Sequence, residues 1–414
     1  MILHRSGGWP GVRSWIGLSG PLGWVLLATL VSGCSLTIEG AEPPRQATEK
    51  VVQRSFVAQK GMRIEIGNLV GKIRVQGAGG GSEVEVEGTI HAAADTEAEA
   101  ESLADTLELA FNEEPGRLLI KARYPVDRHD LYYYSRESVP GLVRLFGGRR
   151  SSMRYMGKRV TVVGRPRAGA VSLYVDIQVK VPEGVAIRVD NGVGLIEAAD
   201  IRSALSAASR SGDISANSCA GDFKLKTLSG DIVISDHQGD LQVDTGSGDI
   251  DVVSVRGSTS ANTGSGDVTI NDMEGESLTA DTGSGDISLA GVKSSILADT
   301  GSGDVRGTDL RVGPRLACDT GSGDVHLSGD LSGVMELELE TGSGNVELEL
   351  LAKVPSMHLL LFTSSGDIEV DIPGLQVVSR ERRRLEAKIG EQGAQAKVKT
   401  GSGDIRVRAR SSTE

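Results

Sequence analysis

Short runs of alternating apolar and polar residues recur along the C-terminal half of the chain, separated by glycine-rich turns. Between Asp249 and Asp267, for example, Ile250 and Val252 alternate with polar residues, and a turn near Gly257 precedes a second short run. Alternation with a period of two places Ile250 and Val252 on one face of a strand. The runs are rich in β-branched residues and lack helical spacing, which favours strands. Each unit therefore predicts two strands and two turns.

The segment Thr-Gly-Ser-Gly-Asp closes most of these units at nearly constant spacing. Successive copies lie 18, 18, 18, 19, 18, 20, 21, 22 and 37 residues apart, and the last interval corresponds to two units, one of which lacks the motif. The residues that close the copies are Asp213, Asp231, Asp249, Asp267, Asp286, Asp304, Asp324, Asn345, Asp367 and Asp404. Repeats of this kind predict stacked units that contact only their neighbours. The chain is therefore predicted to be mainly β, with a parallel β-solenoid of about 18-residue coils over residues 186–410.

The last predicted strand alternates Arg406, Arg408 and Arg410 with apolar residues. The end of a solenoid exposes an unpaired strand edge, and charged side chains discourage pairing with another chain. We therefore expect this strand to form the C-terminal edge and its arginines to protect that edge.

Residues 56–185 carry longer strands and one predicted helix over residues 96–111. Thr96 and Glu99 have the spacing of a capping box at the start of this helix. The apolar residues with helical spacing are Leu103, Leu107, Ala110 and Phe111. We expect the helix and a small sheet to cap the first coil of the solenoid, which would otherwise expose strand edges.

Residues 124–167 look like an insertion in this region, with ten Arg or Lys and three acids, whereas the whole chain has a net charge of -12. Arginine and tyrosine are enriched at binding hot spots and stack on sugars, bases or lipid headgroups. A solvated loop that offsets nearby acidic charge is the alternative. Nucleic acid is a poor partner because the rest of the chain would repel it. The candidate binding residues are Tyr132, Tyr133, Tyr134, Arg144, Arg149, Arg150, Arg154 and Tyr155.

Residues 1–33 have basic residues, then an apolar stretch, then small residues before Cys34. This order is typical of an export signal, and glycines interrupt an apolar run that is short for a membrane span. Residues 34–55 are expected to form a polar tether.

The sequence Val31-Ser32-Gly33-Cys34 resembles the lipobox of bacterial lipoproteins, although Val31 stands where leucine is usual. The resemblance implies cleavage before Cys34, acylation of Cys34 with palmitate among its fatty acids, and attachment of the mature chain to a membrane. Ser35 after the cysteine implies sorting to the outer membrane where a cell has one. An ordinary secretory signal with an incidental cysteine is the alternative.

The two remaining cysteines, Cys219 and Cys318, lie more than five coils apart in the predicted solenoid. That separation is about 25 Å, which is too far for a disulfide. We predict that both are free and buried. The six histidines are scattered without zinc-site spacing, so no metal site is predicted from them.

Coils in register would stack the acids of the repeated motif about 4.8 Å apart, where each neighbouring pair repels by about 1 to 3.5 kcal/mol. Ca²⁺ would offset this repulsion. Hydrogen bonds from turn backbone N–H groups and Ser or Thr hydroxyls would offset it too, and we favour this turn-capping hypothesis. Calcium-binding RTX rolls carry two Gly-Gly-x-Gly-x-Asp segments per coil, whereas this chain has one Gly-Ser-Gly-Asp. No cofactor is therefore expected, and Ca²⁺ remains the alternative.

The repeats, the strand at 174–182 and a degenerate first copy at 191–196 resemble the bacterial putative-adhesin family, a β-solenoid domain of unknown function on exported and membrane-anchored proteins. The resemblance covers about residues 60–410 and implies a surface or envelope role without catalytic residues. The leading hypothesis is a non-enzymatic, lipid-anchored cell-envelope protein, at the outer membrane, cell surface or periplasm. Its solenoid would be an adhesin-like binding surface for glycan or an envelope protein, or a spacer. The alternatives are a polysaccharide-active β-helix enzyme and an envelope-stress signalling partner.

Overall fold

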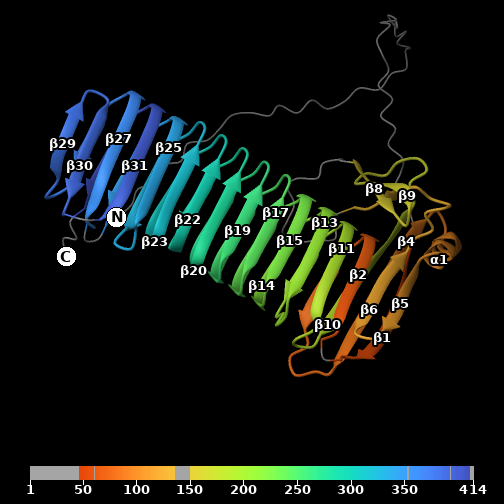
Figure 1. The fold of residues 1–414 in the computed structure, drawn as a ribbon. Helices are drawn as coiled ribbons and strands as arrows, with labels where there is room; N and C mark the ends of the chain where they lie inside the picture. The colour runs from red at the N-terminus through yellow and green to blue at the C-terminus, as the bar shows by residue number, and fades with distance from the viewer. Residues whose placement is uncertain (1–45, 60, 136–149, 352–353, 392, 411–414) are drawn as a thin grey trace, which may run out of the picture. The chain divides into compact units, whose positions relative to one another are not determined.

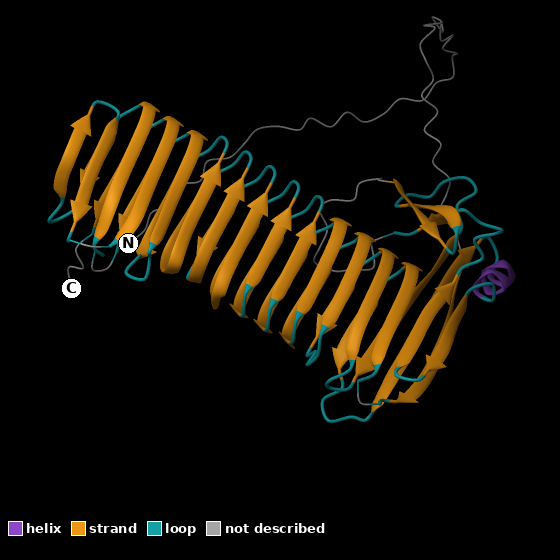
Figure 2. Cartoon of the chain, viewed as in Figure 1, coloured by secondary structure: helices purple, strands orange, loops and turns teal. Residues whose placement is uncertain are grey.

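Two columns of hydrogen-bonded strands run through the part of the chain that the structure describes (Figures 1 and 2). The computed structural model describes residues 46–410, except for 60, 136–149, 352–353 and 392. Each coil of the solenoid contributes one strand to each column, and neighbouring coils pair in parallel and in register. Ile232, for example, lies beside Ile250, which lies beside Val268. The predicted parallel β-solenoid is confirmed.

The first strand column contains, in spatial order, β5 (Glu108–Glu114), β6 (Arg117–Arg123), β2 (Arg63–Val70), β11 (Ala186–Val193), β13 (Leu205–Ser211), β15 (Phe223–Ser229), β17 (Leu241–Thr245), β19 (Thr259–Thr263), the second half of β20 (Val268–Thr282), β22 (Lys293–Thr300), the second half of β23 (Val305–Thr320), β25 (Glu336–Ser343), β31 (Ala394–Ser402), β27 (Met357–Ser365), β30 (Arg384–Ile389) and β29 (Gln376–Glu381).

The second strand column contains, in spatial order, β1 (Gln46–Val57), β4 (Glu83–Ala94), β10 (Ser172–Val181), β3 (Ile73–Gly77), β12 (Ile196–Ala199), β14 (Ile214–Ala220), β16 (Ile232–Gln238), β18 (Ile250–Arg256), the first half of β20, β21 (Ile287–Ala290), the first half of β23, β24 (Val325–Asp330), β26 (Val346–Leu350), β32 (Ile405–Ala409) and β28 (Ile368–Asp371). The pairs β1–β4, β4–β10, β5–β6, β27–β30 and β30–β29 are antiparallel. A separate small sheet has the order β7 (Leu131–Tyr133), β9 (Lys158–Val163), β8 (Arg150–Tyr155).

One hydrophobic core fills the space between the columns from Met62 to Val407. Ile250 and Val252, which the alternation places on one face, are both fully buried. Residues 40–414 form a compact unit that holds this whole core, so the unit has what it needs to fold on its own. Cys219 and Cys318 are free and buried, as predicted, and burial raises the pKa of the Cys318 thiol to about 12.

The single described helix, α1 (Glu97–Ala104), begins with the predicted capping box between Thr96 and Glu99. The predicted end at residue 111 is wrong, because residues 108–114 form β5. Leu107 and Leu109 are buried and alternate with polar residues, so a strand period replaces the helix period beyond Thr106. Pairing with β6 then satisfies the backbone of β5.

The predicted tether over residues 34–55 is wrong at its C-terminal end. β1 starts at Gln46 and pairs with the whole length of β4, with Gln46 beside Ala94. Residues 34–45, including Cys34, lie outside the described residues. The polar composition of residues 46–55 reflects an exposed strand and not a linker.

The last coils do not stack in the order of the sequence. The coil of β31 and β32 inserts between the coil of β25 and β26 and the coil of β27 and β28. The prediction that the arginines of β32 protect an edge is therefore wrong. β32 lies between β26 and β28 and pairs with both. The C-terminal end of the first column is instead the antiparallel hairpin of β29 and β30 (Figure 1).

Candidate binding surface

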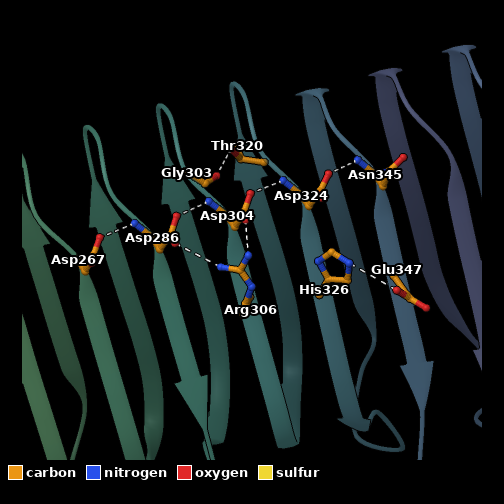
Figure 3. A network of polar contacts seen from close by, with 10 residues as sticks. All are labelled: Asp267, Asp286, Gly303, Asp304, Arg306, Thr320, Asp324, His326, Asn345 and Glu347. Carbon is orange, nitrogen blue, oxygen red and sulfur yellow. Dashed lines mark hydrogen bonds and ion pairs between the residues drawn. The ribbon is translucent and has the colours of Figure 1, made fainter. Parts of the chain in front are cut away.

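The acids that close the repeats form a continuous hydrogen-bonded ladder along one corner of the solenoid (Figure 3). The backbone N–H of Asp304 donates to Oδ1 of Asp286, and the N–H of Asp324 donates to Oδ1 of Asp304, both at 2.8 Å. Equivalent bonds of 2.7 to 3.1 Å link Asp213, Asp231, Asp249, Asp267, Asp286, Asp304, Asp324, Asn345, Asp404 and Asp367 in that spatial order. Each side chain of this series before Asp367 therefore accepts a backbone hydrogen bond, as in the turn-capping hypothesis, but the donor is the N–H of the motif residue in the next coil.

The threonine and glycine of the motif also interact with the backbone of the preceding coil. The Thr320 hydroxyl donates to the carbonyl of Gly303 at 2.8 Å, and the threonine of each other motif from Thr227 to Thr400 makes the same bond. Gly303 has φ of +156°, and a Cβ there would lie 2.0 Å from the carbonyl oxygen of Gly285 in the preceding coil. The threonine and glycine of the motif therefore allow neighbouring coils to stack closely.

Charge along the ladder is offset in part by nearby basic groups. Arg306 forms ion pairs with Asp286, at 3.3 Å, and with Asp304. Beside the ladder, Nε2 of His326 lies 3.4 Å from Oε2 of Glu347, an acid outside the ladder (Figure 3). Where basic groups are lacking, burial and then the neighbouring motif acids raise the pKa of Asp251. Among the described residues, no group of three or more His, Cys, Asp or Glu has the geometry to hold a metal ion.

A second column, mostly of acids, faces outward on the first strand column, at the residue before the motif threonine in six successive coils. Its members are Asp244, Asn262, Asp281, Asp299, Asp319 and Glu340. Burial and then the neighbouring acids raise the pKa values of Asp299 and Asp319. Hydrogen bonds from Lys397 and Lys399 lower the pKa of Glu340 to about 2. The column therefore ends, near the inserted coil, in a neutralised cluster.

The tyrosines of the predicted basic insertion are mostly part of the core. Tyr132 is fully buried, and its ring packs edge-on against Tyr124 at 5.5 Å. Tyr155 packs on the same ring at 5.9 Å, and burial raises the pKa values of all three phenols. These residues are therefore not free to stack on a ligand.

The remaining members of the predicted set are spread out. Tyr133 and Tyr134 are half-buried, and Tyr134 packs edge-on against Tyr174 at 5.0 Å. Arg150 and Arg154 are exposed on β8, whereas Arg144 and Arg149 lie outside the described residues. Within the described part, this set does not form one exposed surface.

A groove of about 940 Å³ runs across successive coils at a different corner of the solenoid. One residue per coil at this corner has left-handed backbone conformation, with φ between 51° and 64°. These residues are Asp236, Ser254, Asp272, Gly291 and Asp309. Non-glycine residues rarely adopt this conformation, and aspartate tolerates it better than most. The left-handed residue bends each strand away from its straight course, and the bends lie side by side along the groove.

A column of charged and polar side chains lies two residues after these bends. It contains Gln238, Arg256, Glu274, Lys293, Arg311 and Asp330, which pair in register from one strand to the next. We call this set the charged column. Together with the bend residues it gives the groove five acids and three bases. The same left-handed conformation recurs at Asp200 and Ser218, which do not line the groove, so it belongs to the corner of the coil, and the charged column is what distinguishes the groove.

Between the bend residue and the charged column, each coil places one side chain inward. In one coil this residue is His237, which is 1% exposed and packs on Phe223 at 4.6 Å. Neither ring nitrogen has a hydrogen-bond partner, and burial lowers the pKa of His237. Cys219 and Val255 hold the matching positions in the adjacent coils, so His237 belongs to the core under the groove.

Sequence reasoning missed this groove. The signal was present, because Asp236, Ser254 and Asp272 recur at the same interval as the glycine motif. A single polar residue inside a predicted strand does not indicate a left-handed conformation, however. The glycine motif, which is the stronger signal, indicates the corner that carries the ladder.

Comparison with known proteins agrees with this architecture. The profile of the Toastrack DUF4097 family matches residues 174–353 and, again, residues 238–408. The chain belongs to this family. The matched region holds the whole groove and the whole ladder. None of the curated proteins matches the chain.

Three crystal structures of proteins named as adhesins align at low similarity. A putative adhesin from Parabacteroides merdae ATCC 43184 has 10% identity and a TM-score of 0.29 over 86% of this chain and 96% of its own. A putative adhesin from Bacteroides fragilis NCTC 9343 has 10% identity and a TM-score of 0.22 over 86% and 97%. A putative cell adhesion protein from Clostridium sporogenes ATCC 15579 has 9% identity and a TM-score of 0.17 over 87% and 100%. In the described part of the chain, no helix has the length and hydropathy needed to cross a membrane.

Proposed function

We propose that this chain is a non-enzymatic, lipid-anchored cell-envelope protein that binds glycan along the groove of its solenoid. In this proposal Cys34 carries the lipid, and the groove is the adhesin-like surface. The observation that carries the proposal is the charged column, which presents hydrogen-bonding side chains from six successive coils at one corner.

The groove is matched to a linear ligand. Five steps between six coils span about 24 Å at the spacing of neighbouring strands. Its side chains include carboxylates, which only accept hydrogen bonds, and guanidinium and ammonium groups, which only donate them. A hydroxyl group both donates and accepts, so a polymer rich in hydroxyls meets a partner at every coil. With acids and bases mixed, the groove does not favour a strongly charged polymer.

The other candidate surfaces fit binding less well. The ladder carboxylates already accept backbone hydrogen bonds, and the tyrosines of residues 124–167 are largely buried. The groove side chains are exposed instead: Arg256, Glu274, Lys293 and Arg311 all face solvent. They are therefore available to a ligand from outside.

Titration of residues 40–414 with neutral and acidic polysaccharides purified from cell envelopes tests the proposal. We expect a neutral glycan to bind, and Arg256→Gln with Arg311→Gln to weaken binding at least about tenfold, which corresponds to about 1.4 kcal/mol. The matched control is Arg210→Gln, an exposed arginine outside the groove. Equal binding by both variants would contradict the groove assignment, and release of new reducing ends would contradict the non-enzymatic assignment.

Lipid anchoring needs a separate test. Cells expressing the chain are labelled with radioactive palmitate, and the wild type is compared with Cys34→Ser. We expect label in the wild type alone. Label in neither protein, with normal export of both, would favour an ordinary secretory signal.

A further inference from the structure

The N-terminal end of the first strand column is strongly acidic. Residues 95–114, which contain α1 and β5, include eight acids and no base. Glu101 on α1 and Glu113 on β5 are exposed. Among the described strands, β5 pairs with β6 alone, so its other edge carries unpaired backbone groups.

The C-terminal end of the same column is basic. Residues 376–389, the hairpin of β29 and β30, include five bases and two acids. The arginines at and near its turn are exposed: Arg380, Arg382, Arg383 and Arg384. Within the described residues, β29 pairs with β30 alone, and Val377 and Val378 are 52% and 53% exposed beside the arginines.

These two ends are complementary in three ways. They terminate the same strand column, and each leaves a strand edge open. Residues 95–114 carry a net charge of -8 and residues 376–389 a net charge of +3. At the acidic end, three of the eight acids pair with bases of neighbouring strands, and the other five form no ion pair among the described residues: the pairs are Asp105–Lys50, Glu108–Arg123 and Glu114–Arg117. Two like ends would repel, because charges of one sign on both edges oppose pairing. Contact between an acidic end and a basic end removes that obstacle and covers the exposed valines.

We propose that copies of this chain bind one another head to tail, with the β29–β30 hairpin of one copy against the α1–β5 end of the next. The contact uses different surfaces on the two partners, so each bound copy keeps one acidic and one basic end. Association therefore continues from copy to copy along the direction of strand stacking. This proposal does not depend on the glycan-binding function.

Two variants, each altered at one end, give the sharpest test. The basic-end variant carries Arg382→Glu and Arg383→Glu in the hairpin turn. The acidic-end variant carries Glu101→Lys and Glu113→Lys, at exposed positions outside the ion pairs that the structure shows. Molar mass is measured by light scattering on residues 40–414 at increasing protein concentration.

We expect the mass of the wild type to rise with concentration. The basic-end variant, whose hairpin changes from +3 to -1, should stay monomeric, and the acidic-end variant, whose end changes from -8 to -4, should associate at least about tenfold more weakly than the wild type. At a concentration where neither variant alone associates, an equimolar mixture of the two variants should reach twice the monomer mass, because one intact acidic end and one intact basic end remain. Raising NaCl from 50 to 500 mM should weaken wild-type association at least about tenfold.

A wild type that stays monomeric at 50 mM NaCl and millimolar concentration would overturn the proposal. Self-association of the basic-end variant, or self-association of the acidic-end variant at wild-type strength, would overturn it as well. Dimers in the mixture also show that the unaltered end of each variant is folded, so misfolding cannot imitate the expected result.

Discussion

The insertion of the coil of β31 and β32 places opposite charges on neighbouring strands. Reversing the charge of its arginines should lower the stability of this coil. Arg406 lies 3.4 Å from Glu369 of β28, and Arg408 lies 3.7 Å from Glu369 and 3.9 Å from Glu347 of β26. Glu347, Arg406 and Glu369 are register partners across β26, β32 and β28. If β32 did not insert, Glu347 and Glu369 would meet directly. Charge therefore favours the observed order of coils.

The magnitude follows from these three exposed ion pairs. Each pair contributes about 0.2–1 kcal/mol, and a like-charge pair costs a similar amount. Replacing both arginines by glutamate turns these three cross-strand attractions, and the pair of Arg406 with Asp404, into repulsions. We therefore expect the C-terminal coils to lose about 1–4 kcal/mol after solvent screening. Replacement by glutamine should cost about half as much, because it removes attraction without adding repulsion.

Hydrogen–deuterium exchange of residues 40–414 measures this effect coil by coil. We expect Arg406→Glu with Arg408→Glu to speed amide exchange in residues 394–409 and 357–371, while exchange near β16 stays unchanged. Adding Glu347→Arg and Glu369→Arg should restore protection. Unchanged exchange in residues 394–409 would refute the role of charge in holding this coil, and faster exchange without rescue would assign the effect to packing instead.

Three further substitutions test single residues. A Cβ at Gly248, where φ is +151°, would lie 2.1 Å from a carbonyl oxygen of the preceding coil. Gly248→Val should therefore lower the free energy of unfolding, measured in urea melts, by about 3 kcal/mol or more. The control is Gly80→Ala, which has open space around it and should leave the free energy of unfolding unchanged. Burial lowers the pKa of His237, so below the unfolded-state value of 6.5 the unfolded chain binds a proton more readily than the folded chain, and the free energy of unfolding falls as the pH falls. His237→Leu should reduce that acid sensitivity and raise the free energy of unfolding by about 1–3 kcal/mol, and an unchanged pH profile would count against this account. Asp286→Asn should change the melting temperature little, with or without Ca²⁺, because an asparagine oxygen still accepts the hydrogen bond, as that of Asn345 does. A large loss of calcium-dependent thermal stability in this variant would favour the cation hypothesis.

The repeated part of the fold was predictable because each coil repeats the same local information. Alternation placed Ile250 and Val252 inward, and glycine spacing located the turns. The start of α1 was predictable too, since a capping box is encoded by two residues three positions apart. Its end was not, because β5 forms through pairing with β6, a contact that local propensity does not contain.

The order of the last coils could not be read from spacing. Residues 357–371 and residues 394–409 have similar apolar patterns, and either would fit beside β25 and β26. Cross-strand charge favours the observed order, for example through Arg406 between Glu347 and Glu369, and this juxtaposition appears only when three strands are placed together. The burial of Tyr132 could not be predicted for a related reason. The sequence around a tyrosine with arginines nearby does not show whether its side chain packs inward or faces solvent.

The candidate site was the least predictable feature. Asp236 and its counterparts matter because of their backbone conformation, and the charged column becomes continuous only when strands pair in register. The glycine motif, the strongest signal in the sequence, marks the hydrogen-bonded ladder and not the groove.

The most direct test of the central claim is a footprint of bound glycan. Hydrogen–deuterium exchange of residues 40–414 is measured with and without the neutral envelope polysaccharide. Binding along the groove predicts slower exchange in short segments that recur once per coil, at residues 236–239, 254–257, 272–275, 291–293 and 309–311, with little change at the ladder. Protection confined to the ladder or to residues 150–163, or no protection despite binding, would contradict the assignment of the groove as the binding surface.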